Sequence, residues 1–197
     1  MKLLKAYTLA LAGMVCAAPA QVKTRDTAKE GDGKPGITDA KFIGYVMDAH
    51  WYWRKMHCAQ DLTWDPALAQ AALQSVNKCT DMPEHDRGGS NLSAVGPAAD
   101  NEDKWYNDSA EMVHGWHQEE VLYPYDHPYY DDAWGHFSQM VWRDTSRVGC
   151  AWGYCPGKKF PGRLYCFYDP PGNNIAENNI LFPENVWKPV CQIPNHK

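Results

Sequence analysis

The sequence predicts an α+β domain in which helices pack on a central antiparallel sheet and disulfides staple the elements together. Apolar residues recur at helical spacing in the first part of the chain, whereas short runs rich in aromatic residues and valine, bounded by glycine and proline, fill the later part. Helices first and strands later are typical of α+β folds, because the strands pair with one another and the helices cover them.

The first twenty residues predict a signal peptide. Lys2 and Lys5 form a basic start, Leu9–Cys16 is a short apolar run, and Ala18-Pro19-Ala20 supplies the small residues of a cleavage site. The run is too short to span a bilayer, so we expect a secreted, extracellular protein without a stable membrane anchor. Residues 21–37 are polar and glycine-rich, which predicts a flexible N-terminal tail.

The charge of the chain limits its partners. The formal net charge of −5 becomes −7 when the signal peptide leaves, because that segment carries two lysines and no acidic residue. An acidic protein is not expected to bind nucleic acid or anionic lipid headgroups, whereas it can bind a neutral lipid.

Periodicity and capping residues predict three helices. The first covers residues 39–57, with its apolar residues on one face. Asp65-Pro66 provides an N-cap and a proline at the first helical position of the second helix, which ends near Cys79. The third helix begins near Asn101, and its apolar side consists of Trp105, Met112, Val113 and Trp116.

Three short runs then predict strands. They are Phe137–Arg143, Gly149–Tyr154 and Leu164–Tyr168, and residues 158–162 are expected to form the turn of a hairpin. Cys150 and Cys166 lie on the last two strands, so a cross-strand disulfide between them is geometrically reasonable.

Six cysteines remain once Cys16 leaves with the signal peptide. An even number in a secreted chain predicts disulfides, although the number alone leaves many pairings open. A zinc knuckle is the alternative, but the Cys150-x4-Cys155 spacing has no matching second pair.

Three motifs carry a family resemblance. They are Leu62–Ala69, Gly135–Trp142 with Val148-Gly149-Cys150 shortly after it, and Cys166–Asn173. In this order they resemble the CAP superfamily of cysteine-rich secretory proteins, antigen 5 and group-one pathogenesis-related proteins, and in particular its fungal secreted members. The resemblance implies a three-layer α-β-α sandwich, with a CAP domain at residues 38–182 and a C-terminal tail at residues 183–197.

The resemblance also implies the remaining disulfides. By family analogy Cys155 reaches back to Cys79 at the end of the second helix. Cys58 and Cys191 then pair, which ties the C-terminal tail to the end of the first helix.

CAP proteins commonly hold two histidines and two glutamates around one cleft. The second histidine corresponds to His136, and a pattern resembling His-x4-Glu-Asn-Leu places His85 and Ser90 at the first histidine and the first glutamate. The second glutamate follows a tryptophan by three residues, which here gives Asp108 after Trp105. The implied site therefore has a serine in place of one glutamate.

The substitution changes what this site can do. His85, Asp108 and His136 can still supply three ligands to zinc and leave one position open. The hydroxyl of Ser90 can neither neutralise a cation nor act as a general base near neutral pH, so metal binding and hydrolysis are both weakened. Two interpretations stay open, a weakened divalent-metal site and a hydrogen-bonded polar cluster without metal. Neither requires a cofactor.

Residues 123–134 form an aromatic segment broken by two prolines, which excludes regular helix or central strand. Tyr123, Tyr125 and Tyr130 match an aromatic-x-aromatic-x4-aromatic spacing that, in fungal CAP proteins that export sterols, is associated with sterol binding. Rigid rings at the surface suit a flat apolar ligand such as a sterol. The alternative is that these rings simply cover the sheet and the third helix.

These features lead to three functional hypotheses. The first is a secreted protein that binds, and in this way exports, sterols or fatty acids without turnover. The second is an extracellular effector or defence-related module whose partner is a protein. The third is a divalent-metal-dependent hydrolase. A Ser-His-acid hydrolase is not favoured, because Ser138 and His136 would share a strand face without contact and no G-x-S-x-G motif occurs.

Two sequons, at Asn91 and Asn107, are candidate glycosylation sites. Both fall in segments that the fold is expected to bury in part.

Overall fold

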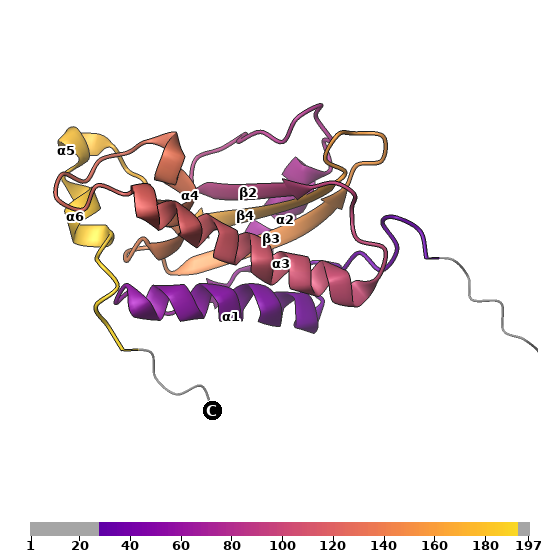
Figure 1. Cartoon of the computed structure of the whole chain (residues 1–197), viewed down its shortest axis with the longest axis horizontal. Helices are drawn as coiled ribbons and strands as arrows, with labels where there is room; N and C mark the ends of the chain where they lie inside the picture. Colours follow the sequence, from indigo (N-terminus) through magenta and orange to yellow (C-terminus); the bar gives the residue numbers. More distant parts are fainter. Residues whose placement is uncertain (1–27, 193–197) are drawn as a thin grey trace, which may run out of the picture.

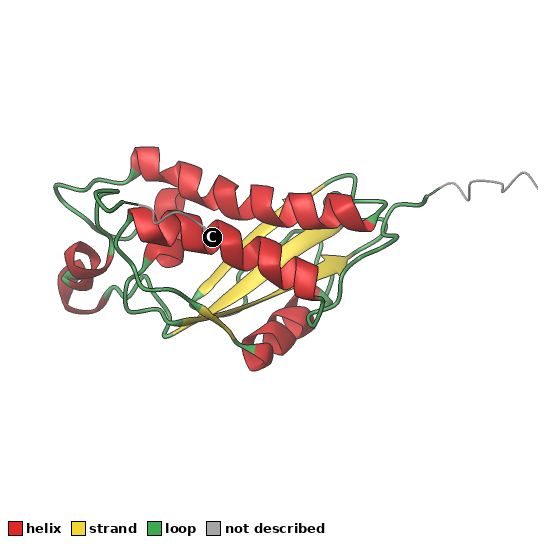
Figure 2. Ribbon diagram, turned by 90° about the horizontal axis from the view of Figure 1, so that it is seen from below, coloured by secondary structure: helices red, strands yellow, loops and turns green. Residues whose placement is uncertain are grey.

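The computed structural model describes residues 28–192. Three layers are visible in Figures 1 and 2: α1 (Ala40–Met56) and α3 (Glu102–His117) lie side by side on one face of a four-stranded sheet, and α2 (Pro66–Val76) covers the other face. The predicted α+β class and the α-β-α sandwich are confirmed.

The sheet has the strand order β1-β3-β4-β2. β3 (Arg147–Tyr154) and β4 (Gly162–Asp169) form the predicted antiparallel hairpin, and β2 (Ser90–Val95) pairs antiparallel with the other edge of β4. The two-residue strand β1 (Thr63–Trp64) pairs parallel with β3, so the sheet is mixed at this edge. Helices cover both faces, which explains why β3 and β4 are buried almost without interruption.

The predicted helix starts are confirmed. Asp39 and Asp65 each accept two backbone N–H groups at the first turns of α1 and α2, and Asn101 accepts one at α3. Pro66 occupies the first turn of α2, where its missing N–H is tolerated.

The helix α2 packs closely on β3 because two positions of that strand lack a side chain. A Cβ atom at Gly149 would lie 2.2 Å from the backbone nitrogen of Ala69, and one at Gly153 would lie 2.5 Å from Val76. The glycine of the Val148-Gly149-Cys150 motif is therefore a packing requirement.

The prediction of a strand at Phe137–Arg143 is wrong. Residues Gly135–Val141 form the helix α4, and its residues from Phe137 to Val141 are buried. A seven-residue apolar run is too short for its periodicity to distinguish a buried helix from a buried strand. The strand that completes the sheet is β2, for which we made no prediction.

The predicted N-terminal tail is wrong for residues 28–37, which pack against the domain. The Trp105 indole donates to the carbonyl oxygen of Asp32 at 2.9 Å, and the backbone N–H of Gly31 donates to Ala99 at 2.7 Å. The Lys34 ammonium donates to the carbonyl oxygen of Trp152 at 3.2 Å. The predicted signal peptide and the rest of the tail lie outside the described residues.

The C-terminal part of the domain continues beyond the predicted boundary at residue 182. Two short helices, α5 (Ala176–Asn179) and α6 (Leu181–Asn185), follow the sheet, and Phe182 and Val186 are buried in the core. The chain then reaches Cys191, which is bonded to Cys58. The structure contains all three expected disulfides, Cys58–Cys191, Cys79–Cys155 and Cys150–Cys166.

No helix within residues 28–192 combines the length and the apolar character needed to cross a membrane. The two sequons differ in exposure. Asn107 is exposed on α3, whereas Asn91 is fully buried and its amide donates to the carbonyl oxygen of His136 at 2.8 Å. Of these two side-chain amides, the folded protein therefore leaves only that of Asn107 accessible to a glycan.

Candidate functional site

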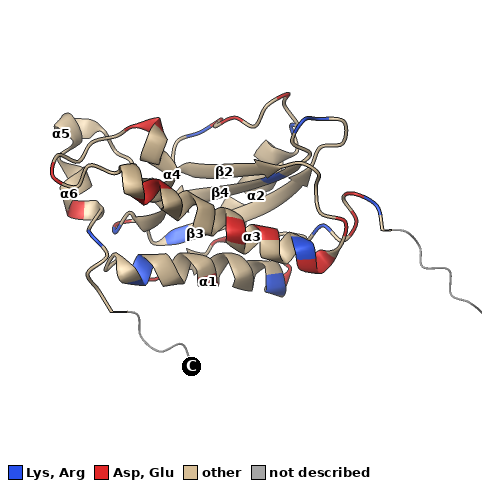
Figure 3. Ribbon diagram, viewed as in Figure 1, with Lys and Arg blue, Asp and Glu red and all other residues tan. Residues whose placement is uncertain are grey.

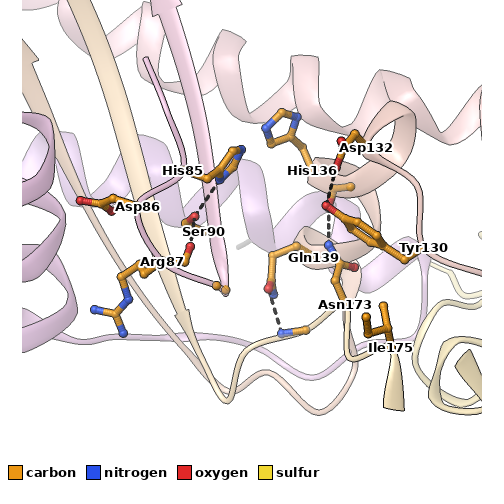
Figure 4. A pocket seen from close by; sticks show the side chains of 14 residues that line it. His85, Asp86, Arg87, Ser90, Tyr130, Asp132, His136, Gln139, Asn173 and Ile175 are labelled. Atoms are coloured by element: carbon orange, nitrogen blue, oxygen red, sulfur yellow. Dashed lines mark hydrogen bonds between the residues drawn. The ribbon is translucent and has the colours of Figure 1, made fainter. Parts of the chain in front are cut away.

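A cleft of about 860 Å³ opens at one end of the sheet. Three segments form it: residues 85–90 before and at the start of β2, residues 130–139 leading through α4, and residues 172–175 after β4. In Figure 4 His85 and Ser90 lie on one side of the cleft and His136 and Tyr130 on the other, while Asp86 and Arg87 point away from it. The lining of the cleft includes His85, Ser90, Tyr130, His136, Asn173 and Ile175.

His85 and Ser90 face each other, as the sequence motif implied. The Ser90 hydroxyl donates to the carbonyl oxygen of Arg87 at 2.9 Å, so its oxygen accepts from His85 Nδ1, which lies 2.8 Å away. This assignment leaves His85 Nε2 as the atom with a free lone pair. Desolvation in the cleft lowers the pKa of His85, and the nearby His136 lowers it further.

His136 lies opposite His85, with the two ring centroids 5.5 Å apart. Its Nδ1 lies 2.7 Å from Oε1 of Glu119, while Oε2 of the same carboxylate accepts the backbone N–H groups of His136 and Phe137 at 3.0 and 3.1 Å. His136 Nε2 is buried and has no hydrogen-bond partner. The carboxylate therefore orients the ring so that Nε2 keeps its lone pair.

The structure does not bring Asp108 to this site, which corrects the predicted metal ligand. Asp108 lies near the middle of α3, and both of its carboxylate oxygens bind the Lys104 ammonium, at 2.8 and 2.9 Å. A tryptophan followed three residues later by an acid occurs twice in this helical region, as Trp105 with Asp108 and as Trp116 with Glu119. Only the second pair meets His136, with Trp116 stacked beside the imidazole. The sequence therefore carries the signal for Glu119 in the same spacing that predicted Asp108.

The cleft offers a divalent ion two imidazole nitrogens. The unpartnered, buried Nε2 of His136 fits such a role, and Glu119 fits the carboxylate that commonly orients a metal-binding histidine. Ser90 adds a neutral oxygen in place of a charge, so the donor set is weaker than the usual two histidines and two glutamates. When bound, a zinc ion would supply Lewis acidity at this position.

Replacing Ser90 by glutamate is expected to tighten zinc binding in the cleft by about 1 kcal/mol or more, because a charged ligand then faces the two imidazoles. Zinc titration followed through the ring NMR signals of His85 and His136 measures this site directly. Ser93→Glu is the matched control, since an odd spacing along β2 places residue 93 on the opposite face. Equal gains in both variants would contradict the prediction.

The aromatic segment is divided between the core and the cleft. Tyr123 is buried against Tyr125 and Phe137, with ring centroids 4.9 and 5.4 Å away, and the Tyr125 hydroxyl donates to Glu120 at 2.8 Å. Tyr130 is 39% exposed and lines the cleft. The expectation of three rings at one lipid site is therefore wrong for Tyr123, which covers the core, and Tyr125, packed against that core, does not line the cleft either.

Exposed apolar side chains continue from this segment. Val121 and Leu122 precede it on the 3₁₀ helix η1 (Gln118–Leu122), and Tyr129 lies beside Tyr130. In the lining of the cleft, Ile175 is 64% exposed. Tyr130 and Ile175 are thus the two large exposed apolar side chains beside the polar groups of the cleft.

A second hollow lies between α1 and α3. It measures about 270 Å³, and its lining consists of Tyr45, Asp48, Ala49, Tyr52, Ala110 and His114. Small residues on the facing helices leave this space open.

Comparison with known proteins identifies the fold family. The sequence profile described as "Cysteine-rich secretory protein family" (CAP) matches residues 47–168, more than half of the chain. This chain belongs to the CAP family. The cleft described above is therefore the cleft of a CAP domain.

The relatives of this CAP domain include fungal proteins. "Secreted protein RBT4" of Candida albicans is 28% identical over 87% of this chain, and a "Probable pathogenesis-related protein" of Arthroderma benhamiae is 32% identical over 76% of it. The chain spans 48% of the length of each of them. Among solved structures, the hookworm platelet inhibitor matches with a TM-score of 0.58 and 19% identity, over 72% of this chain and 75% of that one, which shows a shared fold.

Proposed function

We propose that this protein is a secreted CAP protein that binds a neutral lipid, first of all a sterol, by burial without turnover. The observation that supports the proposal best is a cleft of about 860 Å³ whose lining includes two large exposed apolar side chains, Tyr130 and Ile175. Pockets of this size hold ligands as large as typical drugs, with apolar walls for affinity and a few polar groups for orientation.

Secretion is part of the proposal. The N-terminal segment has the composition of a signal peptide, the domain is held by three disulfides, and the Candida relative is named a secreted protein.

The cleft chemistry suits a sterol. Such a ligand presents a flat apolar ring system and one hydroxyl. The ring system can lie on Tyr130 and Ile175, and the hydroxyl can reach the polar groups of Ser90 or Asn173 on the floor. A neutral ligand also agrees with the acidic net charge of the chain.

Binding without turnover is favoured by the state of the polar groups. Glu119 is engaged by two backbone N–H groups and by His136, and Ser90 already accepts from His85. Ser138 is fully buried and its hydroxyl lies 2.6 Å from Asn173 Oδ1, so it is not presented as a nucleophile.

Replacing Tyr130 by alanine is expected to weaken sterol binding by about 1.4 kcal/mol, which is tenfold in Kd, because the ring loses its stacking surface. Titration of the purified protein with a fluorescent sterol measures Kd. Tyr52→Ala is the matched control, since Tyr52 is 40% exposed and lines the hollow between α1 and α3 instead.

Two outcomes would contradict this proposal. The parent protein could show no saturable sterol binding, or Tyr130→Ala could bind as tightly as the parent. A loss confined to Tyr52→Ala would instead place the lipid between the helices.

The hollow between α1 and α3 is the second candidate, for the chain of a fatty acid. Its volume of about 270 Å³ and the aromatic rings and alanines in its lining favour a narrow alkyl ligand. Acidic residues lie along α3 (Figure 3), and Asp48 is part of the lining of the hollow. Because these negative charges repel a carboxylate, the headgroup of a fatty acid would have to project into solvent.

A further inference from the structure

A second cluster of ionisable side chains lies apart from the cleft. His57 caps the C-terminus of α1, His117 ends α3, and Glu120 lies on η1. Within residues 28–192 this is the only trio of His, Cys, Asp or Glu side chains whose ligand atoms all lie within 4.8 Å of one another.

The three ligand atoms converge in a largely buried space. Nε2 of His57 and Nε2 of His117 are 2.9 Å apart. Nε2 of His117 is 3.4 Å from one carboxylate oxygen of Glu120, and Nε2 of His57 is 3.9 Å from the other. His57 is fully buried and His117 is 7% exposed, while the Glu120 side chain is 22% exposed. One side of the cluster therefore opens to water.

The hydrogen bonds of this cluster define which ring nitrogens carry lone pairs. His57 Nδ1 donates to the carbonyl oxygen of Trp187 at 2.5 Å, so His57 Nε2 carries a lone pair in the neutral ring. A proton on His117 Nε2 can be donated to His57 Nε2 at 2.9 Å, while Oε1 of Glu120 accepts the Tyr125 hydroxyl at 2.8 Å. The nitrogen and oxygen atoms of the three side chains therefore converge on one point, held together by a single imidazole–imidazole hydrogen bond.

We propose that His57, His117 and Glu120 bind a divalent transition-metal ion of the zinc class. A tetrahedral ion with bonds of about 2.0–2.1 Å separates its ligand atoms by roughly 3.3 Å, and the distances found here lie on either side of that value. Binding requires the ring proton of His117 to move from Nε2 to Nδ1, so that both imidazoles present lone pairs. The fourth position is filled by water from the open side.

Neighbouring groups already hold the ligands in orientation. The Trp187 carbonyl oxygen fixes the tautomer of His57, and the Tyr125 hydroxyl donates to Oε1 of Glu120 at 2.8 Å. Trp53 stacks on His117 with ring centroids 3.6 Å apart. Such supporting contacts are typical of metal-binding histidines and carboxylates.

The ligand types select the metal. Two imidazoles and one carboxylate suit zinc, copper or nickel, whereas calcium and magnesium prefer oxygen ligands alone. An ion here would join α1, α3, η1 and, through Trp187, the C-terminal segment beside the Cys58–Cys191 disulfide. It would therefore fix the start of the aromatic segment that leads to the cleft.

The test is zinc titration of the purified, chelator-treated protein by calorimetry, with Glu120→Gln and His117→Gln as variants. Glutamine at position 120 keeps an oxygen for the Tyr125 hydroxyl and removes only the charge. We expect the parent to bind zinc, and each variant to bind it at least about tenfold more weakly. His114→Gln, one turn earlier on α3, and His85→Gln, in the cleft, are the controls and should bind zinc at this site as the parent does.

A second readout separates metal binding from misfolding. At the same zinc concentration the Tm of the parent should rise more than that of Glu120→Gln, and cobalt should give a tetrahedral visible spectrum with the parent and the two controls but not with Glu120→Gln. No zinc binding by the parent, parent-like affinity in both variants, or a loss found only in His85→Gln would each overturn the proposal.

Discussion

Removing the Cys58–Cys191 disulfide by the double substitution Cys58→Ser, Cys191→Ser is expected to lower the free energy of unfolding by about 4–5 kcal/mol. The disulfide closes a loop with a sequence separation of 133 residues, so its loss releases much conformational entropy in the unfolded chain. In the folded state it also holds the hydrogen bond from the Cys191 N–H to the carbonyl oxygen of Met56.

Urea unfolding under non-reducing conditions measures this change, and limited proteolysis locates it. We expect new cleavage after Val186, where the chain leaves the core. Val190→Ser is the control, because this side chain is 72% exposed in the same segment and its replacement should change the stability little. A double variant as stable as this control would show that the disulfide adds nothing to the fold.

Replacing Arg54 by methionine is expected to lower the free energy of unfolding by about 3–5 kcal/mol. Arg54 is fully buried on α1, and its guanidinium donates to four carbonyl oxygens rather than to a carboxylate. The acceptors, at 2.8–2.9 Å, are the carbonyl oxygens of Gln60, Met140, Trp142 and Thr145. Methionine fills part of the volume but leaves these acceptors buried without donors.

The position of these acceptors explains the size of the effect. Three of the acceptors lie at the end of α4 and in the turn that leads to β3, namely Met140, Trp142 and Thr145. Arg54 therefore holds α1 against the segment that joins α4 to β3. Lys55→Met is the matched control, since Lys55 is the next residue and forms a surface ion pair with Asp61. That pair should contribute no more than about 0.5 kcal/mol. Equal urea midpoints for the two variants would contradict the prediction.

The sequence predicted the elements whose signals are local. The caps Asp39, Asp65 and Asn101 satisfy N–H groups within their own first turns, so composition and spacing suffice to locate the helices. The hairpin of β3 and β4 and its cross-strand disulfide follow from two apolar runs joined by a short turn. The family motifs then supplied the layer order and the other two disulfides.

Site residues that are close in sequence were also predicted. His85 and Ser90 belong to one short motif and meet across a hydrogen bond, and His136 lies in the motif that marks the cleft. The choice between Asp108 and Glu119 was different, because both satisfy the same three-residue spacing after a tryptophan. Only the packing of η1 against the start of α4 shows which carboxylate reaches the histidine.

Tertiary contacts decided the features that depend on distant groups. Phe137–Val141 is helical although its apolar run also suits a strand, because Glu119 accepts the N–H groups at the start of α4 and the neighbouring elements bury these five residues. His57, His117 and Glu120 form a cluster because the ends of α1 and α3 meet at η1, over a sequence distance that no local pattern encodes. The sequence by itself determined the three long helices, the hairpin and the family. The three-dimensional packing alone decided which acids and imidazoles share a site, since that depends on distances between segments and not on spacing within them.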